Sequence, residues 1–270
     1  MVRFFALVFA LAVPFWVAGA FMGDLPGAPM NLPVGALMFP CPLVAAAILL
    51  RRREGPGATR RLLSRTFAVM GMRRTPWLAA AFVLVPAVDL SAYGLALLGG
   101  PLEGEHASPL AAPLLFAVFF LAAASEEAGW MGYAADPLRK RWGPLGAGLI
   151  LGVVWGAWHV VPLFQAGRSL AWIAWWFLGA VAARVIIVWL YTRTGASVLS
   201  AIVFHAMLNV VPSLLPGYAA GEVLIACSAL VTTLVAAAVM LSGALSPVGE
   251  SRRSTEGGED TQSGGHNRWL

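Results

Sequence analysis

The sequence predicts an all-α, polytopic membrane protein of about eight transmembrane helices with an intramembrane polar site. The 270-residue chain is 59% hydrophobic and only 11% charged, which is more apolar surface than a soluble globule of this size can bury. Apolar runs of about 20 residues, the length that crosses a bilayer as a helix, recur along it. Carboxylate and imidazole side chains interrupt three of these runs, where a charged group costs about 3 kcal/mol at mid-depth.

The expected spans follow one another along most of the chain. We place them near residues 4–22, 33–50, 76–99, 110–135, 147–164, 170–191, 197–213 and 222–243. The first is expected to be a retained helix, although Ala18-Gly19-Ala20 also permits a cleavable signal peptide. Asp136-Pro137 is expected to end the fourth span, and the fifth is expected to begin near Ala147.

Two segments fall outside this pattern. Residues 51–74 mix arginines with apolar side chains, which is typical of an amphipathic surface helix and also of a solvated basic loop. From Ser246 onward the chain is almost free of apolar residues. The sequence therefore predicts a transmembrane helical domain over residues 1–245 and a disordered cytoplasmic tail over residues 246–270.

The basic residues indicate an orientation. They gather in alternate connections, which eight spans place on one side together with both termini: Arg51, Arg52, Arg53, Arg60, Arg61, Arg65, Arg73, Arg74, Arg139, Lys140, Arg141 and Arg193. Cytoplasmic connections carry such an excess, so both termini should be cytoplasmic. The positive charge then reflects contact with the lipid bilayer and not with nucleic acid. The preference for Arg over Lys and the abundance of Ala favour a bacterial plasma membrane, and Cys41 and Cys227 are expected to be small core residues.

Glu126 and Glu127 stand near the end of the fourth span. Successive helix positions differ by about 100°, so the two carboxylates cannot face one point. One is expected to face a site and the other to find a partner. The alternative is a pair of interfacial glutamates at a helix end, although the sequence stays apolar for several residues beyond them.

Histidines stand in two later spans. Gly148, Gly152 and Gly156 form a stripe of small residues that lets a neighbouring helix approach closely, and His159 lies on the same face. His205 and Asn209 are one turn apart on another span, where they could also serve as interhelical glue. Because polar groups inside a membrane are expensive, Glu, His and His-x3-Asn on three spans are expected to meet in one site.

These residues fit a known pattern in order and spacing. Glu126-Glu127-Ala128-Gly129-Trp130-Met131-Gly132-Tyr133 is followed by Trp155-Gly156-Ala157-Trp158-His159 and then by His205-Ala206-Met207-Leu208-Asn209. Over about residues 115–215, the catalytic core that we expect, the chain resembles the CPBP family of intramembrane proteases. This is the CAAX protease and bacteriocin-processing, or ABI, family, which is related to type II CAAX prenyl endopeptidases.

The resemblance implies an intramembrane endopeptidase acting on membrane-embedded or lipidated proteins and peptides. It implies catalytic roles for Glu126, Glu127, His159, His205 and Asn209, with Glu126 and His159 activating a water. His205 and Asn209 would hold the oxyanion or a metal. Zn²⁺ held by Glu126, His159 and His205 is an optional cofactor, because His and Glu are ordinary zinc ligands while His-x3-Asn supplies only one good ligand.

One position departs from the family motif, which has an arginine where this chain has Met131. An arginine four residues after Glu127 would be its natural ion-pair partner. We hypothesise that Arg184, in the sixth span, pairs with Glu127 instead. The loss of the motif arginine also favours an alternative, a non-catalytic membrane scaffold or bacteriocin-immunity protein on the same fold. A small transporter or proton relay is a third reading, but no inverted repeat is evident.

Overall fold

The computed structural model describes residues 1–68, 75–219 and 221–245, and these ranges hold helices and no strand. The all-α prediction is therefore confirmed. The predicted tail at 246–270 lies outside the described residues, as do Arg73 and Arg74 of the basic segment.

The described residues form eight apolar helices of the main bundle: α1 (Val2–Met22), α2 (Cys41–Glu54), α4 (Thr75–Leu97), α5 (Ala112–Gly129), α6 (Asp136–Gln165), α7 (Leu170–Arg193), α8 (Val198–Leu214) and α9 (Glu222–Leu245). They make up six helical stretches long and apolar enough to cross a membrane, one of which, Pro109–Gln165, contains both α5 and α6, together with the shorter apolar helix α8. The span that contains α2 begins earlier, in the 3₁₀ helix η2 (Val34–Met38), and runs over Val34–Glu54. The predicted set of eight spans agrees with this arrangement.

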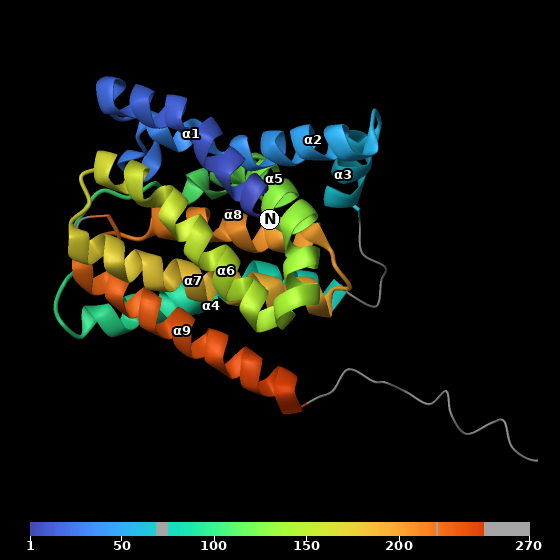
Figure 1. Cartoon of the computed structure of the whole chain (residues 1–270). Helices are drawn as coiled ribbons and strands as arrows, with labels where there is room; N and C mark the ends of the chain where they lie inside the picture. The colour runs from blue at the N-terminus through green and yellow to red at the C-terminus, as the bar shows by residue number, and fades with distance from the viewer. Residues whose placement is uncertain (69–74, 220, 246–270) are drawn as a thin grey trace, which may run out of the picture.

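The helices form a bundle around α8, which is buried along most of its length (Figure 1). α5 and α4 pack against α8, α7 lies between α6 and α9, and α1 and α2 cover one side. Since α8 carries His205 and Asn209, its central place brings that pair within reach of the neighbouring helices. Cys41 is buried and Cys227 half-buried, and both are free thiols, in agreement with their expected role as core residues.

The connection between α5 and α6 differs from the prediction. Asp136-Pro137 does not end a helix, because the chain passes from α5 through one π-helical stretch, η5 (Trp130–Ala135), directly into α6. Proline is tolerated there since the first helical turn needs no backbone N–H. The break comes instead at Gly143, whose φ of 69° and ψ of 175° are not helical, and the membrane-crossing part of α6 follows it. The fifth span therefore begins close to the predicted Ala147, but the break that precedes it lies at Gly143 and not at Asp136-Pro137.

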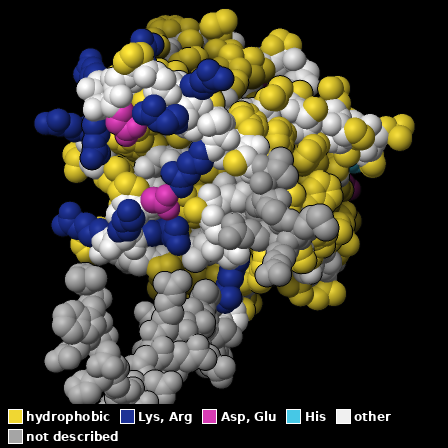
Figure 2. Space-filling view, turned by 90° about the vertical axis from the view of Figure 1, so that its right-hand side faces the viewer, with side chains coloured by type: hydrophobic (Ala, Val, Ile, Leu, Met, Phe, Trp, Pro, Cys, Tyr) yellow, Lys and Arg dark blue, Asp and Glu magenta, His cyan; other side chains and the backbone are white. Residues whose placement is uncertain are grey.

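The basic segment after α2 forms a short helix, α3 (Ala58–Thr66), so the helical alternative is the correct one for these residues. Leu62 and Thr66 are buried against the bundle while Arg61 and Ser64 are exposed. Lysine and arginine side chains gather on this end of the molecule (Figure 2). We call it the basic end, formed by Arg51, Arg52, Arg53, Arg60, Arg61, Arg65, Arg139, Lys140, Arg141 and Arg193.

Candidate active site

The two adjacent glutamates diverge as predicted. Glu127 is fully buried, and its carboxylate accepts hydrogen bonds from Arg184 Nη1 at 2.8 Å and lies 2.7 Å from His205 Nδ1. The hypothesis that Glu127 pairs with Arg184 is confirmed. Glu126 instead lines a cavity, where its Oε2 accepts a hydrogen bond from Trp155 Nε1 at 2.8 Å.

The cavity has a volume of about 480 Å³ and a mostly apolar lining. Four polar side chains that the sequence singled out line it together: Glu126 from α5, His159 from α6, and His205 and Asn209 from α8. The prediction that three spans meet in one site is therefore confirmed for these residues. Glu127 stands behind them, with its carboxylate engaged by Arg184 and His205.

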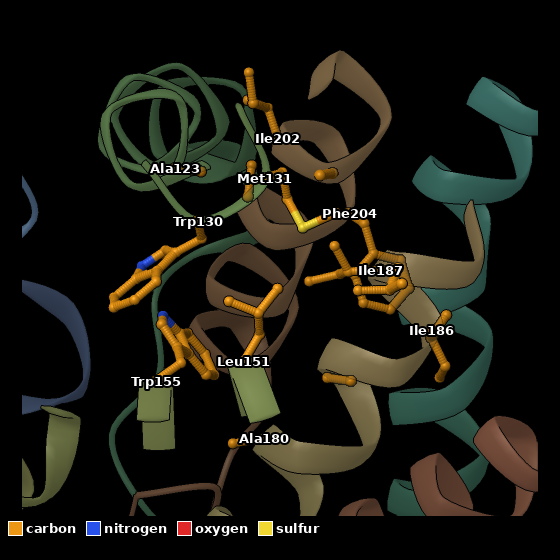
Figure 3. Close-up of a cluster of buried hydrophobic side chains, with 14 of the residues drawn as sticks. Ala123, Trp130, Met131, Leu151, Trp155, Ala180, Ile186, Ile187, Ile202 and Phe204 are labelled. Carbon is orange, nitrogen blue, oxygen red and sulfur yellow. The ribbon is translucent and has the colours of Figure 1, made fainter. Parts of the chain in front are cut away.

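Trp155 connects the members of this cluster. Its indole N–H binds Glu126, its ring centroid lies 4.5 Å from that of His159 and 5.3 Å from that of His205, and the Arg184 guanidinium carbon lies 4.4 Å from it. A guanidinium over an indole face is an attractive contact. One side chain thus orients the carboxylate, both imidazoles and the arginine. Figure 3 shows it in the buried cluster with Trp130 and Leu151.

Each imidazole has one nitrogen already engaged. His159 Nδ1 lies 2.9 Å from the Trp155 carbonyl oxygen, which can only accept, so Nδ1 carries the proton and Nε2 is left with its lone pair in the neutral ring. His205 Nδ1 faces Glu127, which likewise leaves Nε2 for other partners. Asn209 Nδ2 donates to the His205 carbonyl oxygen at 3.2 Å, and its amide has a second N–H.

The glycine stripe explains how Arg184 reaches Glu127. A Cβ added at Gly148 or Gly152 would lie 2.9 Å from the Cα of Val185 or 2.8 Å from that of Val181, and one at Gly156 would meet the Phe177 ring. The stripe on α6 therefore lets α7 approach closely, as predicted, and α7 carries Arg184 into the core. On α5, Gly129 plays the same part toward Pro42 of α2, 2.5 Å from the added Cβ.

Met131 leaves no gap at the position of the missing motif arginine. It lies in the π-helical stretch η5, is fully buried, and belongs to the apolar cluster that includes Ile202 and Phe204 (Figure 3). The positive charge that the motif would supply from η5 is supplied from α7. Glu127 therefore has a cationic partner although Met131 stands at the position of the motif arginine.

Asp89, on α4, was missed in the sequence. It is buried, its Oδ1 accepts a hydrogen bond from Ser228 of α9 at 2.7 Å, and its Oδ2 has no hydrogen-bond partner among the described residues. It lines a small cavity of about 70 Å³ that also touches Trp155, His205 and Asn209. An acid in the middle of an apolar run is the signal that could have found it.

Tyr218, in the connection between α8 and α9, borders both cavities. Burial raises the pKa of its phenol well above the ordinary value, so the hydroxyl stays protonated at neutral pH and available as a hydrogen-bond donor. It was not singled out in the sequence either, because a tyrosine in a loop gives no signal of its own.

Two comparisons with known proteins bear on this arrangement. Residues 108–211 match the family model described as type II CAAX prenyl endopeptidase Rce1-like. The chain carries an Rce1-like domain. It is also 28% identical, over 233 residues, to CAAX prenyl protease 2 of Methanococcus maripaludis, a match that covers 78% of this chain and 83% of that protein. Both findings support an endopeptidase of the CAAX type.

The Rce1-like domain contains the four polar residues of the cavity that the sequence singled out. It begins just ahead of α5 and ends within α8, close to the core that we expected over about residues 115–215. The connection between α1 and α2, which includes η2, lies outside it and closes the cavity from the other side through residues such as Leu32 and Met38. The resemblance to CAAX-type proteases that the motifs predicted therefore agrees with both comparisons, while the role of each residue stays a prediction.

The side chains predicted to hold zinc are not arranged as a metal site. Within residues 1–68, 75–219 and 221–245, no three His, Cys, Asp or Glu side chains come together in an arrangement that could hold a metal ion. The contacts of Glu126 Oε2, His159 Nδ1 and His205 Nδ1 leave Glu126 Oε1 and the two Nε2 atoms as donors. Because these three side chains do not come together closely enough here to hold one ion, they do not fit a three-ligand zinc site in this arrangement, and we route no chemical step through a metal.

Trp155→Phe is expected to lower kcat/KM about fivefold, because the indole N–H to Glu126 is lost while the ring contacts are kept, and one hydrogen bond is worth about 1 kcal/mol. The cleavage rate of the purified protein in lipid would be measured. Trp142→Phe, at an exposed tryptophan, serves as the control. Equal rates for Trp155→Phe and the control would show that the indole does not position Glu126.

Proposed function

We propose that the protein is an intramembrane endopeptidase that hydrolyses a peptide bond with a water activated by Glu126 and His159. Membrane-associated proteins or peptides are its substrates, with CAAX-type processing of lipidated proteins implied by the likeness to its relatives. The observation that carries the proposal is the shared cavity, in which a carboxylate, two imidazoles and an amide from three helices converge.

The reaction begins with transfer of a proton from water to Glu126, while His159 Nε2 orients the water by accepting its second hydrogen. The water oxygen bonds to the carbonyl carbon, and the carbonyl oxygen becomes an oxyanion. Asn209 Nδ2–H and, in its protonated form, His205 Nε2–H stabilise this charge. Glu126 then passes the proton to the nitrogen and the C–N bond breaks, which releases an amine and a carboxylic acid. The acid passes its proton, the second hydrogen of the water, to His159 Nε2 and leaves as a carboxylate.

Glu127 and Arg184 do not touch the reacting atoms in this scheme. Glu127 fixes His205 through Nδ1, and Arg184 compensates the buried charge of Glu127. With Nδ1 held by Glu127, His205 donates from Nε2 when both ring nitrogens carry a proton. Glu127 is therefore a positioning residue, whereas the family resemblance grouped it with the catalytic residues.

Glu126→Gln is expected to lower the cleavage rate about 10²–10⁴-fold, the usual contribution of a general base, while the protein folds normally. Peptide termini in host-cell membranes would be compared between wild type and equally expressed Glu126→Gln, with Glu54→Gln, at an exposed glutamate, as the control. Termini present with wild type and the control but missing with Glu126→Gln would support proteolysis. Identical termini in all three would indicate the scaffold or immunity alternative.

A strong zinc chelator is expected to leave the cleavage rate unchanged, because no three His, Cys, Asp or Glu side chains of the described residues come together closely enough to hold a metal ion. The rate would be measured before and after dialysis against the chelator, together with the zinc content of the protein. A rate that falls with the zinc content and returns when zinc alone is added back would contradict this prediction.

The protein is integral to the membrane, and we place it in a bacterial plasma membrane with both termini in the cytoplasm. The abundance of Arg and Ala in the sequence supports the bacterial membrane, and the charge asymmetry between the two ends of the bundle supports the orientation. The arginines gather at the basic end (Figure 2). The connections at the opposite end carry Asp24, Glu103, Glu105 and Glu222 as well as Arg168. Such an excess of basic residues is typical of the cytoplasmic side.

A further inference from the structure

The small cavity that contains Asp89 shares a wall with the active-site cavity. His205, Asn209 and Tyr218 line both cavities, whereas Asp89 of α4 and Ser228 of α9 line the small one alone. Among the described residues that line the small cavity, none is exposed. Its volume is about 70 Å³, and one water needs only about 10–15 Å³ of such space. An internal space large enough for water therefore lies directly behind the active site.

The far side of the small cavity offers hydrogen-bond acceptors whose own hydrogens are already used. Asp89 Oδ1 accepts from the Ser228 hydroxyl at 2.7 Å, and Oδ2 has no hydrogen-bond partner among the described residues. The Thr232 hydroxyl, one turn after Ser228, donates to the Ser228 carbonyl oxygen at 2.6 Å. Both hydroxyl oxygens then present lone pairs. Since a buried acceptor without a donor is costly, this side of the cavity calls for a molecule that donates hydrogens.

Asn209 stands in the wall between the two cavities, and the direction of its amide decides what it does. One hydrogen of Nδ2 goes to the carbonyl oxygen of His205 at 3.2 Å, which leaves a second N–H and the acceptor Oδ1. A donor in the small cavity would hold Oδ1 on that side and leave the second N–H for the active-site cavity. The reversed amide would turn Oδ1 toward the oxyanion and repel it.

Tyr218 completes the hydrogen bonds of a water between these groups. Burial and, in second place, the charge of Asp89 raise the pKa of its phenol, so the hydroxyl keeps its proton. A water that donates to Asp89 Oδ2 and to Asn209 Oδ1 has a lone pair left, which accepts from the Tyr218 hydroxyl. Such a water makes three hydrogen bonds, the usual number for a buried water.

We propose that Asp89 is a positioning residue for the oxyanion donor Asn209, to which it is linked by water in the small cavity. The water donates one hydrogen to Asp89 Oδ2 and the other to Asn209 Oδ1, so the amide presents its second N–H to the substrate. The role of Asp89 rests on the proposed function. In that scheme Asp89 touches no reacting atom, and it changes the rate only through Asn209.

A cycle of single and double variants tests this link in kcat. Asp89→Leu removes the acceptor oxygens and is expected to lower kcat about tenfold with little change in KM, a part of the loss of about 10²–10³-fold expected without the amide. In the Asn209→Ala background the same substitution should cause no further loss, because the amide through which it acts is gone. Ser91→Ala, at an exposed position two residues along α4, is the control.

A conservative variant distinguishes a water link from an effect of charge. Asp89→Asn keeps an oxygen for the Ser228 hydroxyl and adds an N–H that water can accept, since water both donates and accepts. The expected fall in kcat is therefore at most about twofold. If Asp89 acted by its charge or held a cation, Asp89→Asn would lose as much activity as Asp89→Leu.

Filling the small cavity displaces water while Asp89 and Asn209 stay unchanged. Ala180 of α7 is buried and lines this cavity (Figure 3). Ala180→Leu is expected to lower kcat as Asp89→Leu does, and again without a further loss in the Asn209→Ala background. Ala174→Leu, on the exposed surface of the same helix, is the matched control. Thermal unfolding in detergent is measured for each variant, and Ala180→Leu decides the result if Asp89→Leu does not fold.

Unchanged kcat in both Asp89→Leu and Ala180→Leu would overturn the proposal, as would an undiminished loss in the Asn209→Ala background. Equal losses for Asp89→Asn and Asp89→Leu would overturn it as well. In each of these cases cleavage still depends on Glu126, so the proposed function stands. If wild-type cleavage does not depend on Glu126, the proposed function fails and the role of Asp89 fails with it.

Discussion

Arg184→Met is expected to destabilise the protein by about 3–5 kcal/mol, the cost of removing one partner of a buried ion pair. Both Arg184 and Glu127 are fully buried and joined at 2.7 Å, so the variant would leave Glu127 charged in a dry core or force it to take up a proton. Either outcome also changes the partner of His205. Thermal unfolding in detergent and the cleavage rate in lipid would both be measured, and both should fall.

The control for this variant is Arg193→Met, at the last residue of the same helix. Arg193 lies at the basic end over Trp77 and Trp189, so its removal should cost less than about 1 kcal/mol. The sharper test adds Met131→Arg to Arg184→Met, which moves the charge to its place in the family motif. Recovery of stability in the double variant, relative to Arg184→Met, is expected. Wild-type stability and cleavage for Arg184→Met alone would contradict the role of the pair.

Asn209→Ala is expected to lower kcat about 10²–10³-fold with little change in KM, as removal of one oxyanion donor does elsewhere. The side chain is half-buried, and its recorded hydrogen bond goes to the carbonyl oxygen of His205 in its own helix, so folding does not depend on it strongly. Steady-state kinetics with a substrate found in the termini comparison would separate kcat from KM.

Ser213→Ala is the matched control for Asn209→Ala. Ser213 stands one turn further along α8 and donates to the Asn209 carbonyl oxygen at 2.7 Å, in the same manner as Asn209 donates to that of His205. Loss of such a local bond should leave kcat near the wild-type value. Equal losses for the two variants would show that helix geometry, and not an oxyanion donor at residue 209, is responsible.

Two properties of the sequence, its helical periodicity and the free-energy cost of placing charged side chains in a bilayer, were enough to predict much of the site. Eight apolar runs predicted the eight spans, and the 100° step between successive residues predicted that Glu126 and Glu127 would part. The need of a buried charge for a counter-charge led from Glu127 to Arg184, 57 residues away, and this pair is present. Each of these predictions depends on a large free-energy cost that only a few arrangements of the helices avoid.

Other features could not be predicted because their causes are local or distant. The π-helical stretch η5 depends on backbone packing that has no residue signature, and Asp136-Pro137 reads equally as an end or as a first turn of a helix. Asp89 has its partner Ser228 in a helix 139 residues away, and a serine in a span is common. The position of the cavity depends on which helix ends separate from one another. This separation is set by the packing of the whole bundle.

The Glu127–Arg184 pair has a consequence for the biogenesis of the protein. Translation delivers α5 to the insertion machinery well before α7, with the whole of α6 between them. During that interval Glu127 lacks its partner Arg184. The free energy gained when α5 moves from the translocation channel into lipid is therefore smaller than its apolar residues suggest. The two helices are therefore expected to settle in the lipid as a joint event once α7 has arrived, with the glycine face of α6 holding α7 alongside. Glu127, which positions His205 in the folded protein, would then also determine the order in which the helices assemble.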